Sequence, residues 1–248
     1  MSNVTIVIPC FNEAARLRTT AFVEFARSNR HVRFLFINDG STDDTERMLR
    51  EMCSRSPDQL RTRSLARNSG KAEAVRAGLI DACGTGVEYI GFWDADLATP
   101  LEDIDTFARI LDERPDLQWV FGSRVNLLGR SVHRALVRHW VGRVFATFAT
   151  AVLRLPIYDT QCGAKMFRNT LEFSNLLLQP FLSRWIFDVE LIARFIHARH
   201  DTDLPPVRHV IYEHPLMEWI DVKGSKIKLR DFFRVESDLV RIYWRYMR

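Results

Sequence analysis

Two aspartates in the segment "GFWDADLATP" stand one residue apart, directly after an apolar run and directly before a proline. Alternate residues of an extended segment project to the same side, so the carboxylates of Asp94 and Asp96 can face one point. Their mutual repulsion would raise the pKa of one carboxyl, and a Mg²⁺ or Mn²⁺ ion shared with substrate phosphates would relieve it. The other interpretation is that Asp96 or Thr99 caps a helix from Leu101, which Pro100 favours at its first turn. These residues alone leave both interpretations open.

Polar residues also follow three other apolar runs of the first half. They are found in "CFNE" (10–13), "DGSTDD" (39–44) and "ARNSGK" (66–71). Gly70 and Lys71 suit an anion, through a helix N-terminus and an ammonium group. The stretch "NDGS" would serve a tight turn equally well. The sequence contains neither a GxGxxG fingerprint nor a P-loop motif, which excludes the usual dinucleotide and P-loop sites.

The elements that must position these residues alternate between two hydrophobic periods. Five runs are predicted as strands, four of them apolar enough to be buried on both faces: Val4–Pro9, Val32–Asn38, Leu60–Leu65, Val87–Trp93 and Leu117–Ser123. Helices are predicted between them near 14–29, 43–55, 70–83 and 101–113. Such alternation predicts an α/β fold with a mostly parallel, doubly wound sheet. Ligands of these sheets bind beyond the carboxyl ends of the strands, so the four polar segments should gather at one edge.

The second half has a different pattern and is predicted to be mainly helical. A long helix is expected over Ser131–Leu155, a loop over "YDTQCGAKMF" (158–167), and helices near 170–178 and 186–200. A last strand is expected in "LPPVRHVIY" (204–212) and an amphipathic helix from Asp231 to Met247. No linker or repeat interrupts the chain, so one domain over 1–248 is predicted, with a helical C-terminal elaboration.

Composition excludes several classes of protein. A net charge of +4, from 35 Lys and Arg against 31 Asp and Glu, gives no reason to expect nucleic acid as a partner. The four cysteines are scattered without a CxxC pair, which favours reduced thiols in a cytoplasmic protein over disulfides or a zinc site. The longest uncharged apolar run, Val144–Leu153, is too short to span a membrane, and the N-terminal residues do not predict a signal peptide.

Taken together, the motifs resemble family 2 glycosyltransferases of the GT-A fold in their order and spacing. The first four are "IVIPCFNE", "FINDGSTDDT", "NSGKAEAVRAGL" and "GFWDADLATP". With "DTQCGAKMF", "RWIFDVEL" and "GSKI", the segment "DADLATP" resembles the dolichyl-phosphate β-glucosyltransferase branch and its bacterial polyprenyl-phosphate relatives. The resemblance extends from Val4 to Ile227. It implies a metal-dependent, inverting transfer of a hexose, glucose from UDP-glucose, to a polyprenyl or dolichyl phosphate.

The resemblance implies a nucleotide-sugar site within residues 1–124. Its members would be Pro9, Phe11, Asn12, Glu13, Asp39, Asn68, Lys71, Asp94, Ala95 and Asp96. The first loop and Asp39 would hold the uracil and ribose, with Asn38 in place of the first of two aspartates usual in the family. Lys71 would approach the diphosphate.

The carboxylate pair is the metal site that the resemblance implies. Asp94 would contact the ribose or the divalent cation, Mg²⁺ or Mn²⁺, and Asp96 would bind the ion that bridges the diphosphate. Many mannosyl relatives carry a glutamine as a further ligand at the position of Ala98. Alanine there favours the glucosyl branch and leaves fewer protein ligands for the ion.

Residues 125–248 would form the acceptor half. A lipid phosphate is already an anionic nucleophile and needs cations, whereas a sugar or glycan hydroxyl, the alternative acceptor, needs a carboxylate base. The candidate phosphate-binding residues are Arg124, Gln161, Lys165, Arg184 and Lys226, although each cation could equally be a solvated surface charge. Asp188, with Glu190, is the candidate base or cation-orienting group. A buried pair with Arg184 is an equally open interpretation.

Two helical stretches predict peripheral contact with a membrane, on its cytoplasmic face. Arg130, Arg134 and Arg138 fall four residues apart beside apolar residues, as in helices that lie in an anionic interface. The C-terminal stretch places Trp244 and Tyr246 among arginines, and either apolar face could instead cover the sheet. A nucleotidyltransferase with a similar core is a more distant alternative. The intact "DAD", "NSGK" and "GSKI" disfavour a binding protein that has lost catalysis.

Overall fold

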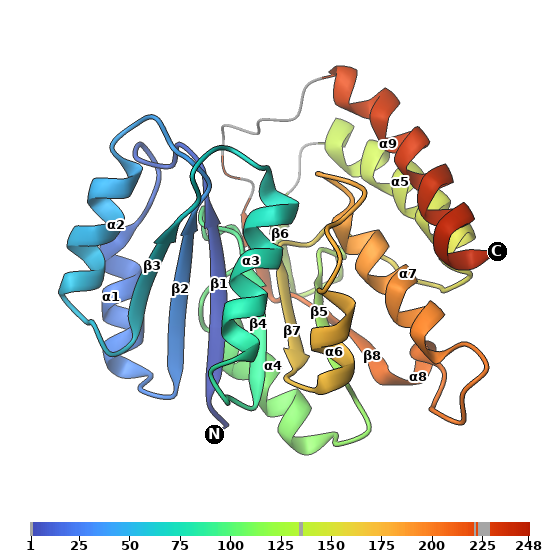
Figure 1. The fold of residues 1–248 in the computed structure, drawn as a ribbon, viewed down its shortest axis with the longest axis horizontal. Coiled ribbons are helices and arrows are strands. Elements are labelled where there is room, and N and C mark those ends of the chain that lie inside the picture. Colours follow the sequence, from blue (N-terminus) through green and yellow to red (C-terminus); the bar gives the residue numbers. More distant parts are fainter. Residues whose placement is uncertain (1, 134–135, 221, 223–228) are drawn as a thin grey trace.

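The centre of the molecule is a seven-stranded sheet with the strand order β3-β2-β1-β4-β7-β5-β8 (Figure 1). The computed structural model describes residues 2–133, 136–220, 222 and 229–248. The sheet strands are β1 (Val4–Cys10), β2 (Val32–Asn38), β3 (Leu60–Ser64), β4 (Tyr89–Trp93), β5 (Trp119–Ser123), β7 (Ala164–Arg168) and β8 (Ile211–Pro215). Neighbouring strands are parallel except around β7, which runs antiparallel between β4 and β5. The predicted α/β fold with a mostly parallel sheet is confirmed.

Helices cover both faces of this sheet (Figure 1). One face is covered by α1 (Thr19–Ser28), α2 (Thr45–Ser54) and α4 (Asp103–Glu113). The other is covered by α3 (Lys71–Cys83), α5 (Leu136–Leu153), α6 (Leu171–Leu176) and α7 (Phe187–Arg199). The C-terminal part adds α8 (Val207–Val210), α9 (Leu229–Ile242) and the π-helix η1 (Tyr243–Met247).

The central strand β1 shows why its sequence is an uninterrupted apolar run. Successive side chains of a strand point to opposite faces, and both faces are buried here. Ile6 and Ile8 belong to the core that includes Phe22 of α1. Val7 belongs to the opposite core, with Leu79 of α3. Parallel pairing with β2 and β4 sets the register of β1 and the direction in which its carboxyl end points.

Strand β7 is the largest departure from the sequence prediction, because it lies in a segment predicted to be a loop. Ala164 and Met166 pack into one core and Phe167 into the other, as strand alternation requires. The alternation is hidden in the sequence because the second residue of the strand is Lys165, and lysine is rarely buried. Its charge is accommodated by an ion pair with Asp188.

Two further elements differ in type from the prediction. The segment predicted as a helix over Ser131–Leu155 begins with a short strand, β6 (Ser131–His133), which pairs with β9 (Glu218–Ile220). The predicted last strand begins only at Ile211, because the two prolines before α8 favour a helical turn at 207–210. Pairing with β5 then sets the strand.

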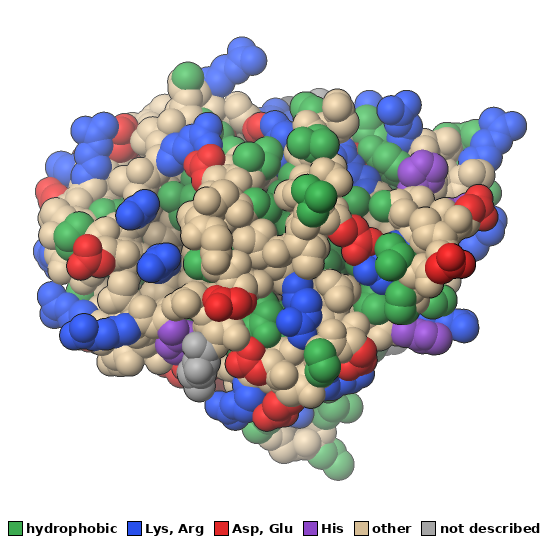
Figure 2. Space-filling model, turned by 60° about the horizontal axis from the view of Figure 1, so that its bottom comes forward, with side chains coloured by type: hydrophobic (Ala, Val, Ile, Leu, Met, Phe, Trp, Pro, Cys, Tyr) green, Lys and Arg blue, Asp and Glu red, His purple; other side chains and the backbone are tan. Residues whose placement is uncertain are grey.

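Helices α5 and α9 lie side by side at one end of the molecule (Figure 1). Within the described residues, neither these nor any other helix has the length and apolar character needed to cross a membrane. Arg134 and the side chain of Arg138, part of the predicted basic stripe, lie outside what the structure describes. Figure 2 shows the side on which β1 begins, where Lys and Arg side chains are interspersed with Asp and Glu.

Candidate active site

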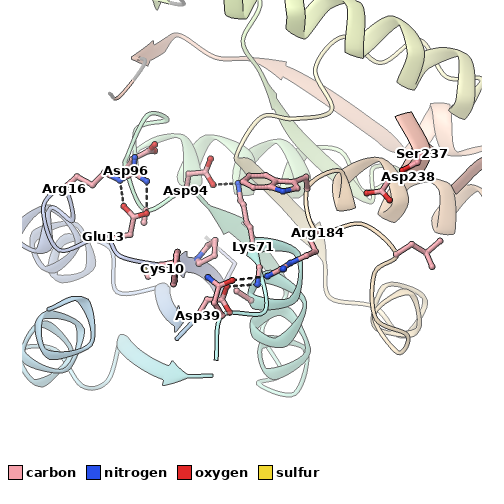
Figure 3. Close-up of a pocket in the computed structure, with 18 of the residues that line it drawn as sticks. Cys10, Glu13, Arg16, Asp39, Lys71, Asp94, Asp96, Arg184, Ser237 and Asp238 are labelled. Atoms are coloured by element: carbon pink, nitrogen blue, oxygen red, sulfur yellow. Dashed lines mark hydrogen bonds and ion pairs between the residues drawn. The ribbon is translucent and has the colours of Figure 1, made fainter. Parts of the chain in front are cut away.

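A cavity of about 760 Å³ opens at the carboxyl ends of β1, β2 and β4 (Figure 3). From the first half of the chain it is lined by Pro9, Cys10, Phe11, Glu13, Arg16, Asp39, Asn68, Gly70, Lys71, Ala74, Asp94, Ala95 and Asp96. From the second half it is lined by Leu182, Arg184, Trp185, Ser237, Asp238 and Arg241. The strand ends therefore bring most of the predicted donor residues together at one edge of the sheet.

Asp94, the first residue after β4, pairs in this cavity with Lys71, the first residue of α3 (Figure 3). Asp94 Oδ1 lies 2.5 Å from Lys71 Nζ, and the two side chains keep 36% and 34% of their surface exposed. Burial disfavours the charged form of Lys71, but the carboxylates of Asp94 and Asp188 outweigh it and raise the Lys71 pKa. The cavity thus contains a charged pair that solvent, and hence a ligand, can reach.

The Asp94 carboxylate can occupy this position because residue 163 is a glycine. The N–H of Asp94 donates to the carbonyl of Gly163 at 2.9 Å, and a Cβ on Gly163 would lie 1.9 Å from Asp94 Oδ2. Any other residue there would displace the carboxylate. The segment just before β7 therefore shapes the cavity, although it belongs to the second half of the chain.

Asp96 is half-buried, and its Oδ1 accepts a hydrogen bond of 3.1 Å from the N–H of Ala98. Burial, together with the charge of Asp94, raises the Asp96 pKa above its ordinary value. The N-cap of α4 is Glu102, so the interpretation of Asp96 or Thr99 as the cap of this helix is wrong. The carboxylate turns back onto its own loop.

The carboxylate pair offers hard oxygen ligands of the kind that Mg²⁺ and Mn²⁺ bind. In the parts of the chain that the structure describes, no group of three or more His, Cys, Asp and Glu side chains could hold a metal ion. Asp94 and Asp96 nevertheless fit an ion that takes its remaining ligands from a diphosphate and water. Burial and the charge of Asp94 raise the Asp96 pKa, although the cations Arg16 and Lys71 oppose the rise.

Asp39 ties the loop after β2 to the loop after β3. Its two carboxylate oxygens accept the N–H groups of Ser69 at 2.7 Å and Gly70 at 2.8 Å. Burial raises the Asp39 pKa, although these two hydrogen bonds act to lower it. In the same loop, Asn68 Oδ1 accepts a hydrogen bond of 3.0 Å from Arg184. Arg184 thus crosses from the second half of the chain to the predicted donor loop.

The end of β1 contributes Pro9 to the cavity, and the loop after it contributes Phe11 and Glu13. Asn12 is not among the described lining residues, and its Oδ1 accepts the N–H of Thr42 at 2.8 Å. It therefore holds the loop after β1 against the loop after β2. Glu13 pairs with Arg16 through two hydrogen bonds. Arg16 is a cation of the cavity that the sequence analysis did not single out, although it follows Glu13 by only three residues.

Asp188 and Lys165 form a second Asp–Lys pair, away from the described lining of the cavity. Lys165 Nζ lies 2.7 Å from Asp188 Oδ1, and the side chains keep only 1% and 7% of their surface exposed. Lys165 also donates to the carbonyl of Cys162 at 2.5 Å. Burial raises the Asp188 pKa, while Lys165 and Lys71 oppose the rise. The sequence interpretation that Asp188 pairs with Arg184 is wrong, because Asp188 pairs with Lys165.

The other predicted acceptor residues lie elsewhere. Arg124 binds both carboxylate oxygens of Asp159, with distances of 2.6 Å from Nε and 2.8 Å from Nη2. The N–H of Gln161 donates to the same carboxylate at 3.1 Å. Among the described residues that line the cavity, neither Arg124 nor Gln161 is found. Lys226 lies outside the described residues.

The C-terminal helix contributes to the cavity in a way that the sequence reading missed. Ser237, Asp238 and Arg241 of α9 line the cavity, and Arg241 Nη1 lies 3.4 Å from Asp238 Oδ1. A signal was available, because residues three and four apart share one face of a helix and these three are all polar. The sequence prediction concerns only the apolar face of this helix, against a membrane or over the sheet, and leaves its polar face without a role.

A mixed, mostly parallel sheet with a carboxylate-lined cavity at its carboxyl edge has the architecture of the GT-A fold. Residues 5–172 match the family described as "Glycosyl transferase family 2", and the chain belongs to this family. Among curated proteins it is similar to dolichyl-phosphate β-glucosyltransferases. The one from Saccharomyces cerevisiae is 29% identical over 98% of this chain and 75% of its own length. The human one is also 29% identical, over 98% of this chain and 76% of its own length.

Solved structures with the same fold include complexes of glucosyl-3-phosphoglycerate synthase from Mycobacterium tuberculosis. The complex with UDP has a TM-score of 0.69 and 17% identity, covering 98% of this chain and 80% of that one. The complex with Mn²⁺, UDP-glucose and phosphoglyceric acid has a TM-score of 0.68 and 17% identity, with the same coverage. At this level of identity the likeness establishes the fold.

Proposed function

We propose that this glycosyltransferase moves glucose from UDP-glucose to a polyprenyl phosphate, with inversion at the anomeric carbon. The observation that carries the proposal is the accessible Asp94–Lys71 pair beside Asp96, at the edge of the sheet where such folds bind nucleotides. The curated relatives, named dolichyl-phosphate β-glucosyltransferases and similar over nearly the whole chain, support this sugar and this class of acceptor.

On the donor side, the loops after β1, β2 and β3 hold UDP. Phe11 and Asp39 contact the uracil, and Lys71 contacts the diphosphate. Lys71 exchanges the Asp94 carboxylate for a phosphate oxygen when the donor binds. Both side chains are already partly solvent-exposed, so the exchange does not require a buried charge to be exposed.

Asp94 and Asp96 would hold the divalent cation, Mg²⁺ or Mn²⁺. A bound ion of this kind stabilises the charge that develops on the departing UDP. The residues of this chain fix the carboxylates for that purpose. Gly163 leaves room for Asp94, and the N–H of Ala98 orients Asp96.

On the acceptor side, an oxygen of the lipid phosphate forms the bond to the anomeric carbon. The bond from that carbon to UDP breaks, and UDP leaves with the bonding electrons. The phosphate is already ionised, so it needs cations and no base. Arg241 lines the cavity from residues 125–248, the proposed acceptor half of a single domain, and is the cation proposed for the lipid phosphate, whereas Arg184 of the same half stands over the donor loop. Asp188 is buried against Lys165 and also feels the charge of Lys71, which suits a group that orients a cation and not a base.

The alternative acceptor is a sugar or glycan hydroxyl, which would need a carboxylate base. One observation favours it: Asp238 lines the cavity and is an acidic group of the acceptor half. Its neighbour Arg241 gives it a cationic partner instead, which is why the phosphate acceptor is preferred here.

Contact with a lipid acceptor would occur at a membrane surface, at the end formed by α5 and α9. Large apolar side chains are exposed on these helices and on η1, namely Val144, Phe148, Val240 and Trp244. Arginines accompany them on η1 and after it. This combination supports peripheral binding to an anionic, cytoplasmic membrane face.

The proposal is tested by incubating the protein with Mg²⁺ or Mn²⁺, a panel of radiolabelled UDP- and GDP-sugars, and a polyprenyl phosphate in detergent. The expected result is a labelled glycolipid formed from UDP-glucose. Transfer only to added water-soluble sugars would favour the hydroxyl acceptor. No transfer from any donor to either acceptor would overturn the proposal.

A further inference from the structure

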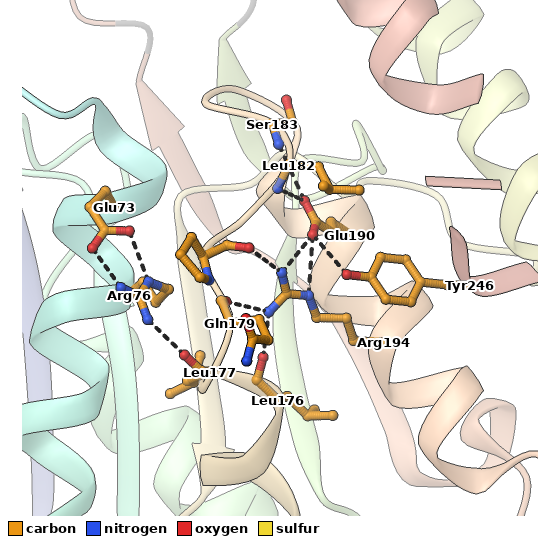
Figure 4. A network of polar contacts seen from close by, with 11 residues as sticks. Glu73, Arg76, Leu176, Leu177, Gln179, Leu182, Ser183, Glu190, Arg194 and Tyr246 are labelled. Carbon is orange, nitrogen blue, oxygen red and sulfur yellow. Dashed lines mark hydrogen bonds and ion pairs between the residues drawn. The ribbon is translucent and has the colours of Figure 1, made fainter. Parts of the chain in front are cut away.

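The segment between α6 and α7, residues 177–186, brings three side chains to the cavity. It is called here the α6–α7 loop. Leu182, Arg184 and Trp185 of this loop line the cavity. No regular strand or helix of the described chain contains it, so its shape must be set by other contacts. Figure 4 shows those contacts.

Arg194, on α7, holds the first part of the α6–α7 loop through main-chain carbonyls. Its Nη1 donates to the carbonyls of Leu176 and Gln179, both at 2.7 Å, and its Nη2 donates to that of Pro180 at 2.7 Å. Its Nε and Nη2 also donate to Glu190 Oε1. The five N–H donors of this guanidinium are therefore matched by five hydrogen bonds.

Glu190, one turn earlier on α7, holds the second part of the same loop. Its Oε2 accepts the N–H of Leu182 at 2.7 Å and that of Ser183 at 3.3 Å. Its Oε1 also accepts the hydroxyl of Tyr246, in η1, at 3.3 Å. The Glu190 side chain is completely buried and the Arg194 side chain keeps 5% of its surface exposed. Such a pair is costly to bury, which favours a role beyond general stability.

The next residue of the loop, Arg184, is the one that reaches across the cavity. Its Nη2 donates to Asn68 Oδ1 at 3.0 Å, and its guanidinium lies so close to Gly70 that an added Cβ would be 2.6 Å from Arg184 Nε. Arg184 thus stands over the loop that carries Lys71. Its position depends on the amides of the two residues before it, and Glu190 holds both.

We propose that Glu190 and Arg194 are positioning residues that fix the α6–α7 loop so that Arg184 meets the nucleotide diphosphate. The inference rests on the proposed function in one respect, that the cavity binds UDP. The pair acts through Arg184 and does not touch the ligand. Tyr246 extends the same network to the C-terminal segment.

The test is a double-mutant cycle on UDP affinity with Arg194→Lys and Arg184→Ala. Each single variant should bind UDP about tenfold more weakly, as expected for the loss of one charge-assisted contact. Arg194→Lys should add nothing further when Arg184 is already Ala, because it acts through that residue. Additive losses, about a hundredfold in the double variant, would overturn the inference. Tyr246→Phe is a milder change in the same network, and it should lower the affinity for UDP less than Arg194→Lys does. Its effect should disappear when Arg184 is already Ala.

Arg199→Lys is the matched control. Arg199 lies on the same helix with 6% of its side chain exposed, but its side-chain hydrogen bonds and ion pair are made to Glu172 and Pro205, which lie outside the loop. Its substitution should leave UDP affinity unchanged. Hydrogen exchange of the nucleotide-free protein gives a reading that does not depend on UDP. The amides of Leu182 and Ser183 should exchange faster in Arg194→Lys and not in Arg199→Lys.

The two readouts separate the two proposals. If the wild-type protein binds no UDP, the proposed function fails, and unchanged exchange of the Leu182 and Ser183 amides would overturn the positioning role as well. Faster exchange confined to the α6–α7 loop would support positioning even then.

Discussion

Two Asp–Lys pairs lie close to one another at the carboxyl edge of the sheet, and they differ mainly in exposure. Asp94 and Lys71 are 2.5 Å apart with about a third of each side chain exposed. Asp188 and Lys165 are 2.7 Å apart and almost fully buried. The same two residue types at nearly the same distance therefore have different chemistry available to them.

Exposure decides which pair can exchange its partner for a ligand. A half-exposed ion pair contributes little to stability, so either member can turn to a phosphate or a cation at small cost. A buried pair cannot, because the member left behind would be an uncompensated charge in the protein interior. The accessible pair is thus suited to binding and the buried pair to holding β7 and α7 in place.

The largest expected effect is on stability, from breaking the buried pair. Lys165→Met should lower the free energy of unfolding by about 3–5 kcal/mol, since Asp188 is left buried without its cation. Urea denaturation measures the loss. The double variant Lys165→Met/Asp188→Leu removes both charges and should recover most of it. A single variant as stable as the wild type would show that the two pairs do not differ as described.

Next comes the carboxylate pair of the cavity. Asp96→Asn should lower kcat for glucosyl transfer about 100- to 1,000-fold, the range seen when one electrostatic contact to a transition state is lost. The melting temperature should change little, because Asp96 is half-exposed. Steady-state kinetics alongside thermal unfolding distinguishes this result from misfolding. Full turnover in Asp96→Asn would exclude the metal-centred mechanism.

Breaking the accessible pair should have a smaller effect, confined to the donor. Lys71→Met should raise the KM for UDP-glucose about tenfold, as loss of one charged contact to the diphosphate predicts. Its cost to stability should stay below about 1 kcal/mol. If Lys71→Met destabilises the protein as much as Lys165→Met, the contrast between the pairs is wrong.

The smallest expected effect is a pH dependence of the rise in melting temperature that Mn²⁺ causes. Burial and the charge of Asp94 raise the Asp96 pKa above its ordinary value of 3.8. A carboxyl with a raised pKa stabilises the fold at low pH, and this stabilisation is lost as pH rises through the folded-state pKa. An ion that binds the charged form should then offset the loss. Mn²⁺ should raise the melting temperature by a few degrees more at about pH 7 than at about pH 4.5. Asp96→Asn should remove the difference.

Much of the fold could be predicted from the sequence because most strands are uninterrupted apolar runs followed by polar loops. Those runs identify β1, β2 and β4, and the rule for parallel sheets then places Asp39, Lys71 and Asp94 together. Strand β7 could not be found in this way, because Lys165 interrupts its pattern. Its burial depends on Asp188, a partner more than twenty residues away.

The remaining part of the site depends on contacts between distant segments. Gly163 matters because of its distance to Asp94, which no local pattern contains. Asn12 belongs to the right loop, but its side chain is directed to Thr42. The contribution of α9 to the cavity depends on how the C-terminal helix packs, and the sequence shows only that one of its faces is polar.

The most direct test of the central claim is a calorimetric titration of UDP into wild type and Asp96→Asn, with and without Mn²⁺. The claim is that the accessible carboxylates and Lys71 form a nucleotide-diphosphate and metal site. Wild type should bind UDP at least about tenfold more tightly with Mn²⁺, and Asp96→Asn should bind UDP but lose that gain. Equal affinity with and without the ion in wild type, or the same gain in Asp96→Asn, would contradict the account.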